Sequence, residues 1–157
     1  MDPRSETEQR LALQLHRWVA ASGQLAHRYA VETELTPTDF KAILHLWEEG
    51  LEGRAVTASQ LAAHLGVTPA AVTYLVERLM KRGYVQRTPN PADRRQVLLS
   101  LSVDGGQLGH GFLRPQASWL NAALSAHSDE AIAHTIDVLT DLTAALTNHA
   151  LRKEHHD

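Results

Sequence analysis

Apolar residues recur at steps of three and four over most of the chain, which is the period of amphipathic helices. The first such stretch runs from Glu6 to Val31 and predicts one long helix. A second helix is predicted after Thr36, because Pro37 suits the first helical position and Asp39 stands three residues after the cap. The apolar stripes of these two helices are Leu11, Leu15, Trp18, Val19, Leu25, Ala26 and Tyr29, then Phe40, Ile43, Leu44 and Trp47.

Two short helices follow, separated by a three-residue turn. The first opens with a capping box at Thr57 and ends before Gly66, which suits the left-handed position after a helix. The second is capped by Thr68, begins with Pro69 and ends before Gly83. Its apolar stripe is Val72, Leu75, Val76, Leu79 and Met80. Two helices joined across so tight a turn predict a helix-turn-helix.

After Gly83 the apolar period changes to two. Residues 84–88 are rich in strand-forming side chains, and residues 96–102 place Val97, Leu99 and Leu101 on one face. The loop between them contains two prolines, which keep it out of the hydrogen-bonded ladder. A helix-turn-helix followed by a β-hairpin predicts a winged helix.

Two further helices are predicted beyond the hairpin. One follows Ser102, where four glycines lower the helix propensity and Pro115 is expected to kink the helix. The other follows Ser128, with the apolar stripe Ile132, Ile136, Leu139, Leu142, Leu146 and Ala150. The predicted fold class is mostly α with a small β-hairpin wing (α+β). Residues 36–102 form the winged helix-turn-helix lobe, and residues 1–35 and 103–157 form one helical lobe around it.

Composition narrows the class of protein. A chain of 157 residues with 43% apolar content is long enough for one domain with a core. No apolar run approaches the roughly 18 residues of a membrane span, and the N-terminus lacks the apolar segment of a secretion signal. The absence of cysteine excludes disulfides, thiolate metal sites and cysteine nucleophiles. We therefore expect a soluble, cytoplasmic protein with no membrane partner.

Charge is unevenly distributed along the chain. The formal net charge is -3, yet residues 68–95 hold six basic and two acidic side chains. The remainder holds nine basic and sixteen acidic side chains. A local basic stripe is what phosphate binding requires, because counterion release depends on local contacts. Charge alone favours an ordinary solvated surface, so the case for nucleic acid depends on where these residues lie.

The second helix of the helix-turn-helix has a polar face that begins with small residues. Such a face permits close approach to the major groove of DNA. Thr73 and Tyr74 can donate to phosphates or meet base edges. Glu77 has two open interpretations, a contact with a cytosine amino group or an ion pair with Lys81. The predicted DNA contacts on this helix are Thr68, Pro69, Ala70, Thr73, Tyr74, Glu77, Arg78 and Lys81.

The predicted wing carries Asp93, Arg94 and Arg95 at its tip. An arginine there can enter the minor groove, where a narrow A·T tract concentrates negative potential. Asp93 is expected to hold one arginine by a charge-assisted hydrogen bond while the other points outward. Arg87, on the first strand of the hairpin, is a further predicted contact. Preceded by a helix-turn-helix, this tip favours DNA binding over an ordinary polar turn.

Four stretches of the chain resemble the MarR family of bacterial transcription regulators. They are the helix start Leu35–Phe40, the segments 61–68 and 76–87, and the tripeptide 93–95. The resemblance covers residues 35–101, whereas the flanking helices fit only in layout. It implies that Arg95, the last arginine of the wing, is the minor-groove residue, with Arg94 as the second candidate. It also implies a homodimer, commonly a repressor, that binds a pseudo-palindromic operator in double-stranded DNA.

The resemblance further implies that the end helices interleave with those of a second copy. The residues support this independently, because three amphipathic helices offer more apolar surface than a winged helix of about 65 residues can cover. The alternative is that these helices pack within one chain. Members of the family often bind small effectors where the dimer helices meet the DNA-binding lobe. In this chain that junction would draw on Trp18, His45, Trp47, His110 and Phe112, although each also suits a core position. The sequence names no effector, operator or regulated gene.

The alternatives to a ligand-responsive regulator are a metal-responsive regulator, an enzyme and a winged helix that contacts only proteins. Ten histidines suggest a metal-responsive regulator, but none lies four residues from another on a helix and no cysteine adds a ligand, so no metal site or cofactor is predicted. An enzyme is not predicted, because no catalytic motif stands where a strand–turn–helix would present it. A winged helix used only for protein contacts stays open, and an absence of DNA affinity would favour it.

Overall fold

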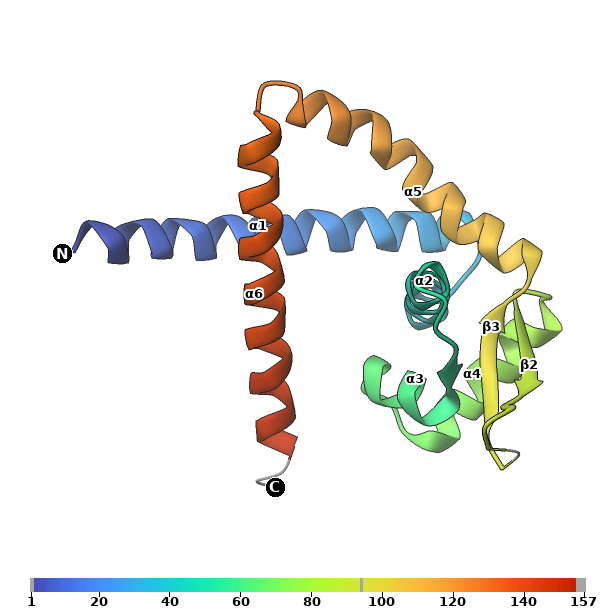
Figure 1. The fold of residues 1–157 in the computed structure, drawn as a ribbon. Coiled ribbons are helices and arrows are strands. Elements are labelled where there is room, and N and C mark those ends of the chain that lie inside the picture. Colours follow the sequence, from blue (N-terminus) through green and yellow to red (C-terminus); the bar gives the residue numbers. More distant parts are fainter. Residues whose placement is uncertain (1, 94, 155–157) are drawn as a thin grey trace. The chain divides into compact units, whose positions relative to one another are not determined.

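Helices make up most of the fold, as the sequence predicts. The computed structural model describes residues 2–93 and 95–154. Along those residues the elements run α1 (Pro3–Glu32), α2 (Pro37–Leu51), β1 (Val56–Thr57), α3 (Ala58–Leu65), α4 (Pro69–Lys81), β2 (Val85–Pro89), β3 (Val97–Leu101), α5 (Val103–Leu124) and α6 (Asp129–Glu154) (Figure 1). Every predicted helix and both predicted strands are confirmed, and so is the mostly helical fold class with its wing.

The sheet has three antiparallel strands rather than the two of a simple hairpin. Strands β2 and β3 form the predicted hairpin, with Arg87 opposite Leu99. The additional strand β1 pairs with the other edge of β3, where Val56 lies opposite Leu99. A strand of two residues has no measurable period, so the apolar pattern could not predict it.

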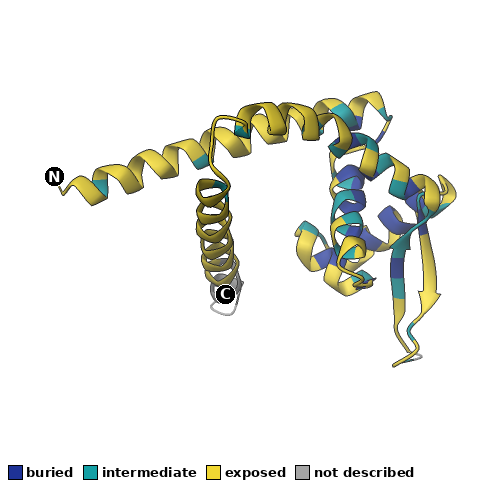
Figure 2. Cartoon of the chain, turned by 45° about the horizontal axis from the view of Figure 1, so that its top comes forward, coloured by how far each residue is buried: buried dark blue, intermediate teal, exposed yellow. Residues whose placement is uncertain are grey.

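The core of the winged helix lies where α2, α3 and α4 meet the sheet (Figure 2). Its largest fully buried apolar side chains are Phe40, Ile43, Leu61, Leu79, Leu99, Val72 and Val76. An aromatic cluster extends this core to α1 and α5. Phe40 packs against Tyr29 of α1 and Phe112 of α5, with ring centroids 5.3 Å and 4.9 Å away. The Tyr29 hydroxyl also donates to the Leu108 carbonyl at 3.1 Å.

The chain divides into two compact units, one ending at Leu113 and the other beginning at Arg114. The first unit holds α1 to α4, the sheet and the first half of α5. The second holds the rest of α5, with Pro115 inside the helix, and α6. The predicted lobes, 36–102 and its two flanking segments, follow expected roles rather than compactness, so that division stays a prediction.

Candidate nucleic-acid interface

Local hydrogen bonds cap the two helices, α3 and α4, on either side of the helix-turn-helix turn. Thr57 and Gln60 form a reciprocal capping box at the start of α3, in which the Thr57 N–H donates to Gln60 Oε1 at 2.8 Å. Gly66 takes the left-handed backbone after α3, with φ 64°. Thr68 Oγ1 then accepts the Ala71 N–H at 3.2 Å and starts α4. Residues close in sequence therefore set the path of the chain into α4.

The outward face of α4 carries the side chains that were predicted to meet DNA. The opposite face is buried through Val72, Leu75, Val76 and Leu79. Tyr74 is 72% exposed, which is high for an aromatic side chain on a packed helix. The other exposed predicted contacts of the helix and its cap, Arg78 apart, are Thr68, Pro69, Ala70, Thr73, Glu77 and Lys81. The structure thus gathers these residues on one solvent-facing surface.

Two polar residues on this surface differ in how their hydrogen-bonding groups are used. Thr73 Oγ1 donates to the Pro69 carbonyl at 2.9 Å, so its proton is used within α4. Its methyl group and oxygen lone pairs are what it can present to a base. Glu77 and Lys81 form no ion pair within the described part of the chain. The carboxylate of Glu77 is therefore directed to solvent rather than to its neighbour on the helix.

Arg78 is a predicted DNA contact whose charged group is paired with a carboxylate of the protein itself. Its Nε donates to Oδ2 of Asp39 at 3.0 Å, and its Nη2 donates to the other carboxylate oxygen. Asp39 is 1% exposed at the start of α2. Its hydrogen bond raises the pKa of the Arg78 guanidinium. Helical spacing placed Arg78 at the flank of the outward face, but nothing in the sequence identified its partner.

Arg82, which follows α4 directly, also binds the protein's own backbone. Its Nη1 donates to the Glu34 carbonyl, and its Nη2 donates to the Thr33 carbonyl at 3.2 Å. Two arginines of the predicted basic stripe are therefore engaged by α2 and by the end of α1. Lys81, Arg87 and Arg95 are exposed and form no ion pair within the described residues.

Hydrogen bonds within the wing loop shape its tip. The Asn90 N–H donates to the Gln96 carbonyl at 3.0 Å, and the two side chains pair at 3.2 Å. Asp93 Oδ1 accepts the backbone N–H of Arg95 at 3.0 Å, whereas the sequence suggested that it would hold an arginine side chain. Arg94 lies outside the described residues. The Arg95 side chain is exposed and forms no ion pair with the described residues.

The five residues predicted for an effector site differ in burial. Trp18 is 57% exposed on α1, and His110 is exposed on α5. Phe112 is buried in the aromatic cluster, and Trp47 packs against the glycine-containing face of α5. His45 faces α3 instead. Phe112 and Trp47 therefore pack in the interior as core side chains, whereas Trp18 and His110 are exposed, and the effector site stays a prediction.

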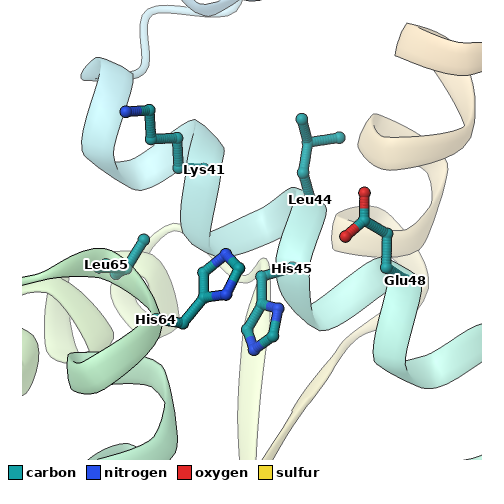
Figure 3. A pocket seen from close by; sticks show the side chains of 6 residues that line it. All are labelled: Lys41, Leu44, His45, Glu48, His64 and Leu65. Carbon is teal, nitrogen blue, oxygen red and sulfur yellow. The ribbon is translucent and has the colours of Figure 1, made fainter. Parts of the chain in front are cut away.

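An open hollow of about 370 Å³ lies between α2 and α3, beside His45 (Figure 3). The ring of His45 stacks on that of His64, with centroids 3.6 Å apart and planes at 11°. The other residues that line the hollow are Lys41, Leu44, Glu48 and Leu65. Burial lowers the pKa of His45, and the neighbouring His64 lowers it further. Burial likewise raises the pKa of Glu48. No pattern in the sequence indicates that these two histidines meet.

The described residues lack two other kinds of feature. No three side chains of His, Cys, Asp or Glu among them are arranged to hold a metal ion. No helix in the described chain is sufficiently long and apolar to cross a membrane.

Sequence comparison places the winged helix among known regulators. Residues 35–97 match the MarR family. The HTH-type transcriptional regulator YcgE of Bacillus subtilis is 40% identical over 97 residues, which are 61% of this chain and 60% of that protein. The multiple antibiotic resistance protein MarR of Salmonella typhimurium is 32% identical over 85 residues, 54% of this chain and 56% of that protein. An HTH-type transcriptional regulator of Mycobacterium leprae is 32% identical over 62% of this chain and 67% of that protein. The matched region therefore spans between about half and two thirds of these relatives.

Solved structures share the fold. A mutant of MepR from a multidrug-resistant S. aureus clinical isolate superposes with a TM-score of 0.73 at 18% identity, covering 86% of this chain and 96% of that chain. Another MepR mutant, bound to an oligodeoxyribonucleotide, gives a TM-score of 0.56 at 20% identity, covering 86% and 97%. At such identities the likeness shows the fold alone, and the sequence match supplies the relationship. The chain belongs to the MarR family of transcriptional regulators.

Proposed function

We propose that this protein is a sequence-specific DNA-binding transcriptional regulator, and a repressor, that binds a pseudo-palindromic operator as a homodimer. Helix α4 enters the major groove with Thr73, Tyr74 and Glu77, and the wing places Arg95 in the adjacent minor groove. The observation that carries the proposal is the exposed polar face of α4 beside a wing whose Arg95 side chain no described residue engages. Such a regulator acts on the chromosome, so we propose a cytoplasmic location.

The chemistry of the surface supports major-groove binding. Pro69 and Ala70 at the start of α4 are small, so the helix can approach the base edges closely. Lys81 and Arg87 flank this region and are suited to phosphate contacts, which fix the register of the protein without reading sequence. Arg78 is left out of the set, because a phosphate would have to compete with the buried carboxylate of Asp39.

The relatives support the same activity. One MepR structure contains an oligodeoxyribonucleotide, and YcgE is named a transcriptional regulator. The family match, residues 35–97, includes the whole of α2, α3, α4 and β2. DNA binding is therefore the part of their activity that this chain is expected to share. The flanking helices lie largely outside that match, so their role rests on their own residues.

Exposed apolar side chains on the flanking helices support a homodimer. On α1 they include Leu11, Leu13, Trp18, Val19 and Leu25, and on α6 they include Ile136, Val138, Leu139, Leu142 and Leu146. Apolar surface of this extent normally marks an interface. A second copy is the expected partner, because two-fold symmetry presents two α4 helices to half-sites about 34 Å apart. No effector is assigned.

Selection of DNA from a random pool tests the proposal without knowledge of the operator. Immobilised full-length protein would be used to enrich duplexes, and the selected duplex would then be titrated by fluorescence anisotropy against a scrambled duplex. We expect a palindromic consensus and a steep loss of affinity with salt, because phosphate contacts release counterions. A pool without consensus, with equally weak binding of both duplexes, would instead favour a winged helix used only for protein contacts.

Substitution of Arg95 is the most direct test of minor-groove binding by the wing. We expect Arg95→Ala to weaken binding of the selected duplex by about 1–3 kcal/mol, because a guanidinium in the minor groove is lost. The free energy of unfolding should stay unchanged, since that side chain is exposed and forms no ion pair with the described residues. Arg10→Ala, on the exposed N-terminal half of α1, removes the same charge and is the matched control. Equal losses in the two variants would mean that the wing contributes only bulk charge.

A further inference from the structure

We propose that Arg78 and Arg82 form a clasp that sets the position of α4 against the connection between α1 and α2. The clasp consists of these two arginines, the carboxylate of Asp39 and the carbonyls of Thr33 and Glu34. It joins the C-terminal end of α4 to the stretch 33–39, whose clasp residues lie 39 to 49 positions away in the sequence. The role assigned here is positioning, and it rests on the proposed function because α4 is the DNA-reading helix of that proposal.

The first half of the clasp is a buried carboxylate with two donors. Asp39 lies in the first turn of α2, where its own N–H donates to the capping Thr36 hydroxyl at 3.1 Å. The positive end of the helix dipole also favours a carboxylate there. Arg78 donates to both carboxylate oxygens while its side chain stays 48% exposed. Two parallel bonds fix direction as well as distance, so Arg78 aligns α4 with α2.

The second half of the clasp holds the C-terminal end of α1. The Leu35 N–H donates to the Ala30 carbonyl at 2.8 Å and the Glu34 N–H donates to the Val31 carbonyl at 3.1 Å, which closes α1 as a Schellman motif. The residue with left-handed backbone is Glu34, φ 55°, where glycine is usual. Helix ends leave carbonyls without partners, and Arg82 supplies the cation that binds those of Thr33 and Glu34.

The two halves act together because of their spacing on one helix. Arg78 and Arg82 are four residues apart, so they project from the same side of the chain. Both guanidinium groups reach back to the α1–α2 region, whereas the Tyr74 side chain, one turn before Arg78, is 72% exposed. A displacement of the end of α1 therefore moves Glu34 and Asp39, and through the arginines it moves α4. The clasp provides a mechanical link from the long helix α1 to the DNA-reading surface.

Asp39 distinguishes positioning from direct DNA contact. Neutralising an acidic residue strengthens DNA binding if only charge matters, because it removes repulsion from phosphates. Asp39 is buried and cannot itself touch DNA. The clasp makes the opposite prediction: Asp39→Asn weakens binding of the selected duplex about tenfold, the effect of misplacing one well-made base contact. The slope of affinity against salt stays unchanged, since no cation has been removed.

The test combines that titration with hydrogen exchange of the free protein. The variants are Asp39→Asn, Arg78→Lys and Arg82→Gln, with Asp104→Asn as the control for removal of an exposed acid. Arg78→Lys keeps the charge but cannot donate to both carboxylate oxygens in the same geometry, so it should weaken binding of the duplex as Asp39→Asn does. The double variant Asp39→Asn/Arg78→Lys should bind the duplex no more weakly than either single variant, because both substitutions disrupt the same contact. In each clasp variant the amides of α4 and of residues 33–35 should exchange faster.

The outcomes separate the clasp from the proposed function. Exchange in α4 that matches the wild type in all three variants overturns the clasp. Faster exchange with wild-type affinity for the selected duplex overturns its positioning role. If selection with the wild type enriches no duplex, the proposed function fails, and exchange alone then decides the clasp. Arg82 is exposed, so Arg82→Gln keeps the test available if a change at buried Asp39 prevents folding.

Discussion

Individual residues show how strongly environment changes the meaning of a side chain. His45 and His64 belong to different helices, and each would be an ordinary surface or half-buried histidine by sequence. Because their rings are stacked, protonation of both would place two positive charges at short range. The charged groups around His45 are His64, Glu49 and Arg54, and Glu48 and Lys41 line the same hollow. Burial is the largest influence on the pKa of His45.

The His45 environment predicts a pH dependence of stability. Its pKa lies below the ordinary 6.5, so the unfolded chain binds a proton at pH values where the native state does not. The stabilisation is complete above about pH 6.5 and is lost as the pH falls toward the native pKa. We expect His45→Gln to reduce this decline in the free energy of unfolding between about pH 7.5 and 5.5.

Urea unfolding at several pH values measures this effect, with His110→Gln on the exposed side of α5 as the control. The pKa of Glu48 is raised, so its contribution has the opposite sign and falls as pH rises above its ordinary 4.5. Comparison of His45→Gln with its parent isolates the histidine. Parallel curves for parent and variant would contradict the assignment.

Among the elements, α5 departs most from what local preference indicates. Gly105, Gly106, Gly109 and Gly111 all lie within this helix, although glycine is the weakest helix former after proline. Three of them, Gly105, Gly109 and Gly111, have a neighbour less than 3.0 Å from where a Cβ would stand. A Cβ on Gly105 would stand 2.1 Å from the Tyr84 carbonyl oxygen, and one on Gly109 would stand 2.7 Å from the Trp47 ring. Contacts with Tyr84, directly before β2, and with Trp47 of α2 therefore explain why glycines that weaken the helix stand at these positions.

A pair of neighbouring glycines tests this explanation. We expect Gly105→Ala to lower the free energy of unfolding by about 1–3 kcal/mol, because backbone must shift to relieve the overlap. Gly106→Ala is the matched control, since nothing lies within 4 Å of its position. That change should stabilise the helix by up to about 1 kcal/mol, the difference in propensity between the two residues. Thermal and urea unfolding measure both, and changes of the same sign would exclude close packing as the cause.

For the whole molecule, the exposed apolar stripes of α1 and α6 predict association with a second copy. Leu139 lies in the α6 stripe, and Asn148 lies about two and a half turns later, on the opposite side of that helix. We expect Leu139→Glu to convert the dimer into monomer, because a charge would be buried in the interface, whereas Asn148→Glu leaves it intact. Sedimentation equilibrium measures both masses. A wild-type protein that is monomeric at all concentrations would rule out the homodimer.

The sequence by itself determined the helices and strands of this protein, because the features that start and end them lie within a few residues of one another. Thr36, Thr57 and Thr68 start helices by accepting a backbone N–H close by, and Gly66 supplies a left-handed turn. The period of apolar residues separated helices from the hairpin for the same reason, since each element buries one face. The family motifs lie within this local framework, so the winged helix and its outward face could be predicted.

Only the tertiary structure decided which distant residues meet. The partner of Arg78, the stack of His45 on His64 and the pairing of Val56 with Leu99 each join segments whose approach depends on packing angles. A side chain's position on a helical wheel states which way it points, but not what lies there. That is why Arg78 could be placed beside the DNA-binding face from sequence, while the buried carboxylate that holds it could not.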